Sequence, residues 1–111
     1  MSLSNATIPE WGPLRTEESR KIEEVLRRHF QDADAYRYNS ASLRVRIIDP
    51  KFKGLSREER DDLVEPVLAQ LDEGSQADIM NLVLLCPDEE RASFRAFISN
   101  EEFEHPSQSM L

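Results

Sequence analysis

The chain has 111 residues, a net charge of −8 and a hydrophobic fraction of 39%, with an isoelectric point near 4.7. This length gives one domain, and the acidic balance disfavours non-specific binding to nucleic acid or anionic membrane, because the long-range field repels phosphate. The single cysteine excludes an internal disulfide, no apolar run approaches the roughly 20 residues of a membrane span, and the N-terminus lacks a signal-peptide pattern. We therefore expect a cytoplasmic domain without membrane association.

Residues 1–15 are predicted to form an irregular N-terminal arm, because two prolines and a glycine interrupt any periodicity there. Trp11 is the exception, and we expect this large side chain to pack back onto the domain. A helix is predicted to begin after Thr16, whose hydroxyl can accept a hydrogen bond from the first turn. Its apolar stripe follows helical spacing and consists of Ile22, Val25, Leu26, His29 and Phe30.

An antiparallel hairpin is predicted next. Residues 35–38 form a candidate short strand, residues 39–41 a turn, and residues 42–48 a second strand with strict alternation. One face of the second strand carries Leu43, Val45 and Ile47, and the other carries Arg44 and Arg46.

A second helix is expected over residues 56–73. Ser56 and Glu59 have the spacing of a capping box, which marks a helix start. Pro66 lies well inside and removes one hydrogen bond, so a kink or a split is predicted there, and Gly74 is expected to close the helix. Its buried stripe is predicted to contain Leu63, Val64, Val67, Leu68 and Leu71.

The apolar run over residues 78–86 predicts a third strand, and its poor alternation indicates a central strand that is covered on both faces or partly by a partner. A last helix is expected to open at Pro87-Asp88, and residues 101–111 are predicted to be a flexible tail. The domain would therefore span residues 16–100. The order α-β-β-α-β-α predicts an α+β fold with a small three-stranded mixed sheet, a parallel crossover between its last two strands, and helices packed mainly on one face.

Several short motifs resemble the BolA family. They are Leu43-Arg44-Val45-Arg46-Ile47-Ile48, Phe52-Lys53-Gly54-Leu55-Ser56, Arg60 with Leu63-Val64, and Pro87-Asp88-Glu89. The order and spacing of the elements agree as well, over about two-thirds of the chain. The resemblance implies a fold similar to class II KH domains and a partnership with a monothiol glutaredoxin around a shared two-iron, two-sulfur cluster. Some members of that family are regulators that bind DNA.

Two positions depart from the family pattern. Asp61 stands where the family typically has a histidine, directly after the helix arginine that Arg60 matches. The loop Asn39-Ser40-Ala41 contains neither the histidine nor the cysteine that the family places between its first two strands. Iron in such clusters is bound by thiolate or neutral imidazole. We therefore expect no family-type cluster, and no metal or other cofactor, in this chain.

No catalytic motif stands out, because His29 and His105 lie in distant segments. Cys86 is the one candidate nucleophile, since it precedes a helix start, but it is interpreted as a small apolar filler at a strand end. The sequence thus favours a non-enzymatic protein-interaction or adaptor domain, with contacts on the sheet and the loop after it. The candidate partner-binding residues are Phe52, Lys53, Gly54 and Asp61.

The alternative hypothesis is a regulator that binds nucleic acid through a local basic patch. Its candidate residues are Arg44, Arg46, Lys51, Lys53, Arg57 and Arg60. A KH-type G-x-x-G loop is absent from the sequence. The same charges could instead pair with neighbouring acids such as Glu58 and Glu59 and keep an edge strand soluble. The oligomeric state is left open.

Overall fold

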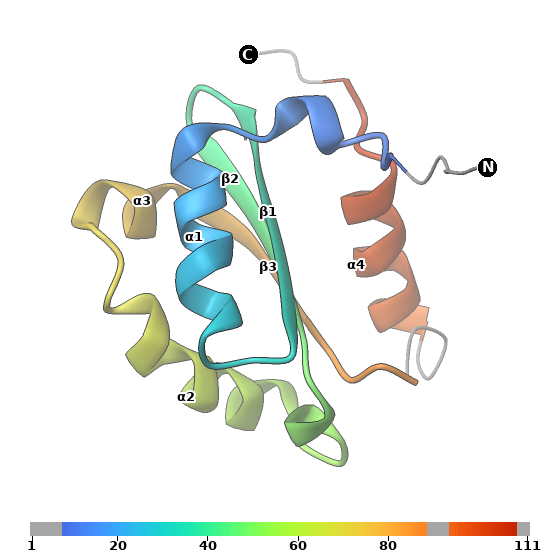
Figure 1. The fold of residues 1–111 in the computed structure, drawn as a ribbon. Coiled ribbons are helices and arrows are strands. Elements are labelled where there is room, and N and C mark those ends of the chain that lie inside the picture. The colour runs from blue at the N-terminus through green and yellow to red at the C-terminus, as the bar shows by residue number, and fades with distance from the viewer. Residues whose placement is uncertain (1–7, 89–93, 109–111) are drawn as a thin grey trace, which may run out of the picture.

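The computed structural model describes residues 8–88 and 94–108, which fold into three strands and four α-helices. In chain order the elements are α1 (Glu17–Arg27), β1 (Asp32–Asn39), β2 (Ser42–Ile48), α2 (Arg57–Leu68), α3 (Glu73–Asp78), β3 (Ile79–Leu85) and α4 (Phe94–Glu104) (Figure 1). Short 3-10 turns lie at Gly12–Leu14 and Pro50–Phe52. The α+β class and the small mixed sheet are as predicted.

The first two predicted helix starts are confirmed by reciprocal caps. The Thr16 hydroxyl accepts from the Ser19 N–H at 3.1 Å, and the Ser19 hydroxyl accepts from the Thr16 N–H at 2.9 Å. Ser56 and Glu59 make the same exchange at the start of α2, at 3.1 and 2.9 Å. These contacts satisfy N–H groups that a helix start leaves without an intrahelical partner. At its other end α1 stops at Arg27, so His29 lies beyond the helix and is exposed, outside the predicted stripe.

The predicted helix over residues 56–73 is divided in two. α2 ends at Leu68, two residues beyond Pro66, and the short α3 follows after a break. Gly74 does not close a helix as predicted. It lies in the first turn of α3, because the Asp72 carboxylate accepts from the Ser75 N–H at 2.9 Å and starts a new helix there. Leu63 is exposed, since the stripe that α2 buries contains Val64 and Val67.

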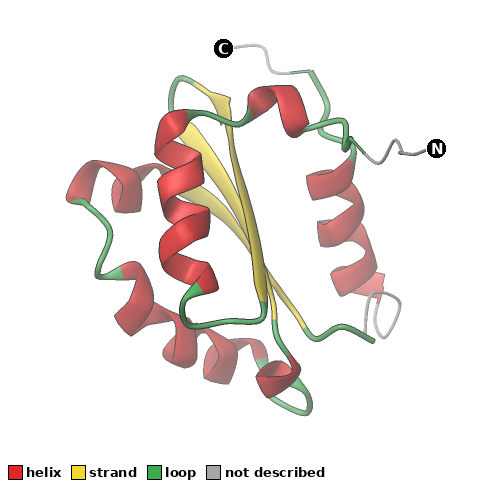
Figure 2. Cartoon of the chain, viewed as in Figure 1, coloured by secondary structure: helices red, strands yellow, loops and turns green. Residues whose placement is uncertain are grey.

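The sheet has the order β1-β2-β3 (Figure 2). β1 and β2 are antiparallel with Ala35 opposite Val45, and β2 and β3 are parallel with Ile47 opposite Leu84. The predicted hairpin and the parallel crossover are therefore confirmed. The expectation that the third strand is central is wrong: β2 occupies the centre, and β3 forms an edge of the sheet. Its apolar run reflects cover on both faces, which a strand at an edge can also have.

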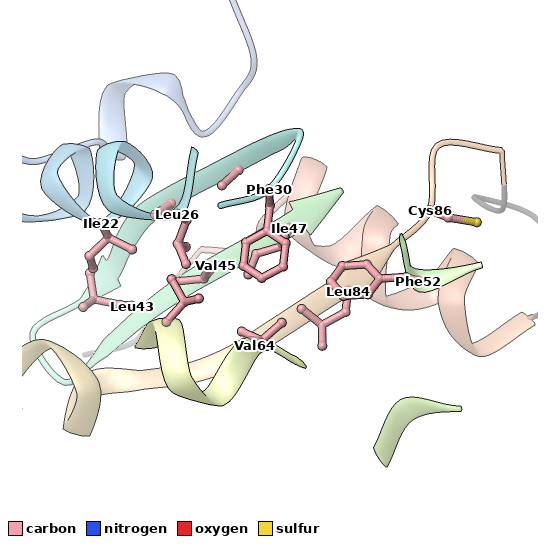
Figure 3. Close-up of a cluster of buried hydrophobic side chains, with 13 residues drawn as sticks. Ile22, Leu26, Phe30, Leu43, Val45, Ile47, Phe52, Val64, Leu84 and Cys86 are labelled. Carbon is pink, nitrogen blue, oxygen red and sulfur yellow. The ribbon is translucent and has the colours of Figure 1, made fainter. Parts of the chain in front are cut away.

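The main core lies between one face of the sheet and the helices α1 and α2 (Figure 3). The alternating residues of β2 predicted to share a face supply its floor, and Phe30 and Phe52 close one end with their rings 5.9 Å apart. Burial of these side chains is the main stabilising term of the fold. The fully buried members of this cluster include Ile22, Leu26, Leu43, Val45, Ile47 and Val64.

A second cluster covers the opposite face, where α4 lies (Figure 1). Trp11 from the N-terminal arm stacks on Tyr36 at 5.5 Å, as expected of a tryptophan that returns to the domain, and Phe103 meets both rings. The prediction of helices mainly on one face missed this second layer. α4 also continues to Glu104, past the predicted domain end at residue 100, with Phe103 only 1% exposed. The last helix was predicted to open at Pro87-Asp88, which lie in a turn, and Glu89 and Glu90, expected near its N-terminus, lie outside the described residues.

Candidate interaction surface at the sheet edge

The two arginines of β2 are buried beneath α4. Arg46 donates to Asp34 at 2.7 Å and to Asn100 at 2.8 Å, and it also pairs with Glu104. Burial opposes the charge of this guanidinium, but the hydrogen bonds that it donates to Asp34 and Glu104 outweigh the burial and raise the pKa of Arg46. Arg44 pairs with Glu102 at 3.3 Å. Both side chains hold α4 on the sheet, and neither forms part of an exposed basic patch.

The other four basic candidates lie in the loop before α2 and in its first turn, and three of them are already engaged within the domain. Arg60 donates to the carbonyl oxygens of Leu84 and Leu55 at 2.9 and 3.0 Å, and Lys51 donates to the carbonyl of His29 at 3.1 Å. Lys53 is exposed, and Arg57 pairs with Asp61 at 2.9 Å. The fold therefore does not bring the six predicted residues into one surface.

The predicted partner loop is also different from the expectation. Phe52 is fully buried in the main core, so it anchors the loop from inside and has no surface for a partner. Gly54 is exposed and adopts a φ of 78°, a conformation that glycine adopts without strain. Asp61 is half-buried and engaged with Arg57. Of the four predicted residues, Lys53 and Gly54 remain freely accessible.

Cys86 lies in the main core, where its thiol donates to the Asp88 carboxylate at 3.1 Å. That hydrogen bond and the nearby Lys53 lower the pKa of Asp88. The burial agrees with the interpretation of Cys86 as a filler. Within residues 8–88 and 94–108, no three His, Cys, Asp or Glu side chains converge to hold a metal ion.

Acidic side chains cap part of the outer edge of β1. The Glu23 carboxylate accepts the Ala35 N–H at 2.9 Å, and Asp32 accepts the Ala33 N–H at 2.9 Å. Arg15 holds Glu23 from the other side at 3.0 Å. An edge strand leaves a row of such N–H and C=O groups that another chain can pair with, and these contacts occupy two of the N–H groups in that row.

The outer edge of β3 is much more open. The Leu85 carbonyl points into the sheet, because it accepts from the Asp49 N–H at 2.9 Å. Backbone groups alternate in direction along a strand, so those of Leu84 and Leu82 point outward. Arg60 occupies the Leu84 carbonyl. At Leu82 no described residue takes the outward N–H or C=O, and Met80 beside it is 67% exposed.

A groove with both apolar and polar lining runs between this open edge and the helices α2 and α3. Its lining includes Leu68, Ala69, Met80 and Leu82, with Arg57 and Glu65 as charged members. Arg57 is engaged with Asp61, whereas Glu65 is exposed and forms no ion pair with any described residue. The open strand and the groove together form what we term the β3 edge site, defined by Glu65, Leu68, Met80 and Leu82.

Sequence reasoning did not find the β3 edge site. The run Leu82-Val83-Leu84-Leu85 predicted a buried strand. Whether a strand is central or at an edge depends on its pairing with other strands, which the run itself does not encode. The signal that was available is the pair Met80-Asn81, where an exposed and a polar residue interrupt the apolar pattern at the start of β3.

Comparisons with family models, with curated proteins and with solved structures found no match to this chain. The chain is a small α+β domain with a mixed sheet, in which acidic side chains cap part of β1 and no described residue pairs with the outward backbone of Leu82 in β3. None of the described helices is long and apolar enough to cross a membrane.

Proposed function

We propose that this chain is a non-enzymatic, BolA-like protein-interaction domain that binds an extended segment of a partner protein along the outer edge of β3. The observation that carries the proposal is the contrast between the two sheet edges. Asp32 and Glu23 occupy the outward N–H groups of Ala33 and Ala35 in β1, while the outward N–H and C=O of Leu82 in β3 have no partner among the described residues. Strand addition at an exposed edge is a common mode of peptide recognition.

The groove beside the edge supports the same proposal. In strand addition, main-chain hydrogen bonds supply affinity and pockets for alternate side chains supply specificity. Leu68, Met80 and Leu82 provide an apolar surface next to the free backbone groups. Exposed apolar side chains beside an unpaired strand are otherwise an aggregation hazard, so a partner that covers them also explains their presence.

A different protein suits the β3 edge better than a second copy of this chain. The exposed side of α2 and the neighbouring positions carry an excess of acid, with Arg57 already paired to Asp61. Two copies joined edge to edge would bring these like charges together, at a net charge of −8 each. The exposed acidic residues of α2 include Glu58, Asp62 and Glu65.

The resemblance to the BolA family suggests a monothiol glutaredoxin as the first complete partner protein to test.

The nucleic-acid alternative gains no support from the described residues. Arg44 and Arg46 are committed to α4, and Arg60 is committed to the backbone of Leu55 and Leu84. A phosphate backbone needs several cations on one accessible surface.

The test uses two synthetic peptides of roughly seven residues, an ordinary strand length, that alternate valine with lysine or valine with glutamate. We expect at least one to slow hydrogen exchange of the Leu82 amide and to shift NMR signals along β3. Leu82→Pro removes the outward N–H and should abolish binding, whereas Leu82→Ala keeps the N–H and loses only apolar contact, so it should weaken binding without abolishing it. An edge strand tolerates proline where its N–H faces solvent. Absence of binding by both peptides, or equal binding by the Leu82→Pro variant, would overturn the proposal.

A further inference from the structure

The groove beside β3 also restricts which extended segments fit. Side chains of an added strand alternate between the two faces of the sheet, so every second one would point toward α2. On that side they meet Leu68, Met80 and Leu82, which form an apolar floor. The residues of the segment that face α2 must therefore be largely apolar.

Glu65 adds a charge requirement. It lies on the α2 wall of the same groove and has no cation among the described residues, while the only basic residue of that wall, Arg57, is engaged with Asp61. A segment with an acidic side chain at this position would place two carboxylates together. A lysine or arginine there would instead find an unpaired carboxylate, and the charge of −8 would attract it from a distance.

We propose that the segment bound at the β3 edge site is amphipathic and basic, with apolar side chains on Leu68, Met80 and Leu82 and a lysine or arginine opposite Glu65. This inference rests on the proposed function, since it assumes strand addition at β3. It adds the sign of the charge and the place where that charge is recognised. The partner is accordingly a protein with a basic strand or basic extended tail.

The experiment compares the lysine and glutamate peptides on three forms of the whole chain: wild type, Glu65→Lys and Glu17→Lys. Glu17 is a matched control, because it is exposed on α1, away from the groove, and its replacement changes the net charge equally. We expect the lysine peptide to bind the wild type more tightly. Glu65→Lys should weaken that peptide about 5-fold, the size of one exposed ion pair, and should strengthen the glutamate peptide.

Several outcomes would overturn the inference. If both peptides protect the Leu82 amide equally, strand addition stands and the charge requirement falls. If Glu17→Lys weakens the lysine peptide as much as Glu65→Lys does, only the net charge matters. If sedimentation of the free chain shows a dimer that Leu82→Pro dissociates, the occupant of the edge is a second copy.

Discussion

Replacement of Phe103 by alanine tests whether α4 and its last turn belong to the folding unit. The Phe103 ring is 1% exposed and lies 4.9 Å from the Tyr36 ring and 5.3 Å from the Trp11 ring. The guanidinium of Arg46 lies over it at 4.5 Å. The hydrogen bond from the Tyr36 hydroxyl goes to the Phe103 carbonyl and survives the change, so the loss is that of the ring's packing and of its contact with the Arg46 guanidinium.

The expected destabilisation of Phe103→Ala is about 3–5 kcal/mol, the usual range for removal of a buried phenylalanine side chain. A domain of this size has a total free energy of unfolding of about 5–15 kcal/mol, so the variant should lose a large part of it. Urea unfolding can be followed by the fluorescence of Trp11, the single tryptophan, and by circular dichroism of the sheet.

Ile98→Ala is the matched control on the same helix. Ile98 is 46% exposed, so its replacement should change the free energy of unfolding by no more than about 0.5 kcal/mol. If Phe103→Ala costs less than about 1 kcal/mol, the reasoning is refuted. The domain would then end near residue 100, as the sequence predicted, and the second core cluster would contribute little.

Two further predictions concern charged groups in the sheet. Burial works against ionisation of Glu104, but the hydrogen bond from Arg46 prevails and lowers the pKa of Glu104 below its ordinary value of 4.5. The stability that ionised Glu104 contributes is therefore present above pH 4.5 and is lost as the pH falls through the depressed pKa. Acid unfolding of Glu104→Gln should accordingly depend less steeply on pH than that of the wild type. An equally steep curve would contradict this assignment. Glu23→Ala leaves the buried Ala35 N–H without its acceptor, so it should lower the free energy of unfolding by about 1–3 kcal/mol and promote self-association through β1. Thermal unfolding and sedimentation measure these two effects. The control Glu24→Ala, on the exposed side of α1, should cause neither.

The sequence by itself determined the local elements, because their causes lie within a few residues. Thr16 and Ser56 began helices where their hydroxyls reach the N–H three positions on, and β2 followed its strict alternation. Pro66 also indicated the break in the second predicted helix, since α2 ends two residues beyond it. The Trp11 side chain packs against the domain, as its size predicted.

The tertiary structure alone decided the order of the strands in the sheet, the packing of α4 on its second face, and the burial of the two charged arginines. Arg44 and Arg46 have the same alternating pattern whether their face meets water or α4, and only the arrival of Glu102 and Glu104 from a distant helix makes their burial favourable. In the same way, Glu23 and Asp32 cap part of β1, whereas Arg60 is the one described side chain that hydrogen-bonds to the outward backbone of β3, near its end, and the backbone of Leu82 stays open. Such pairings join residues far apart in the chain, and no local pattern encodes them.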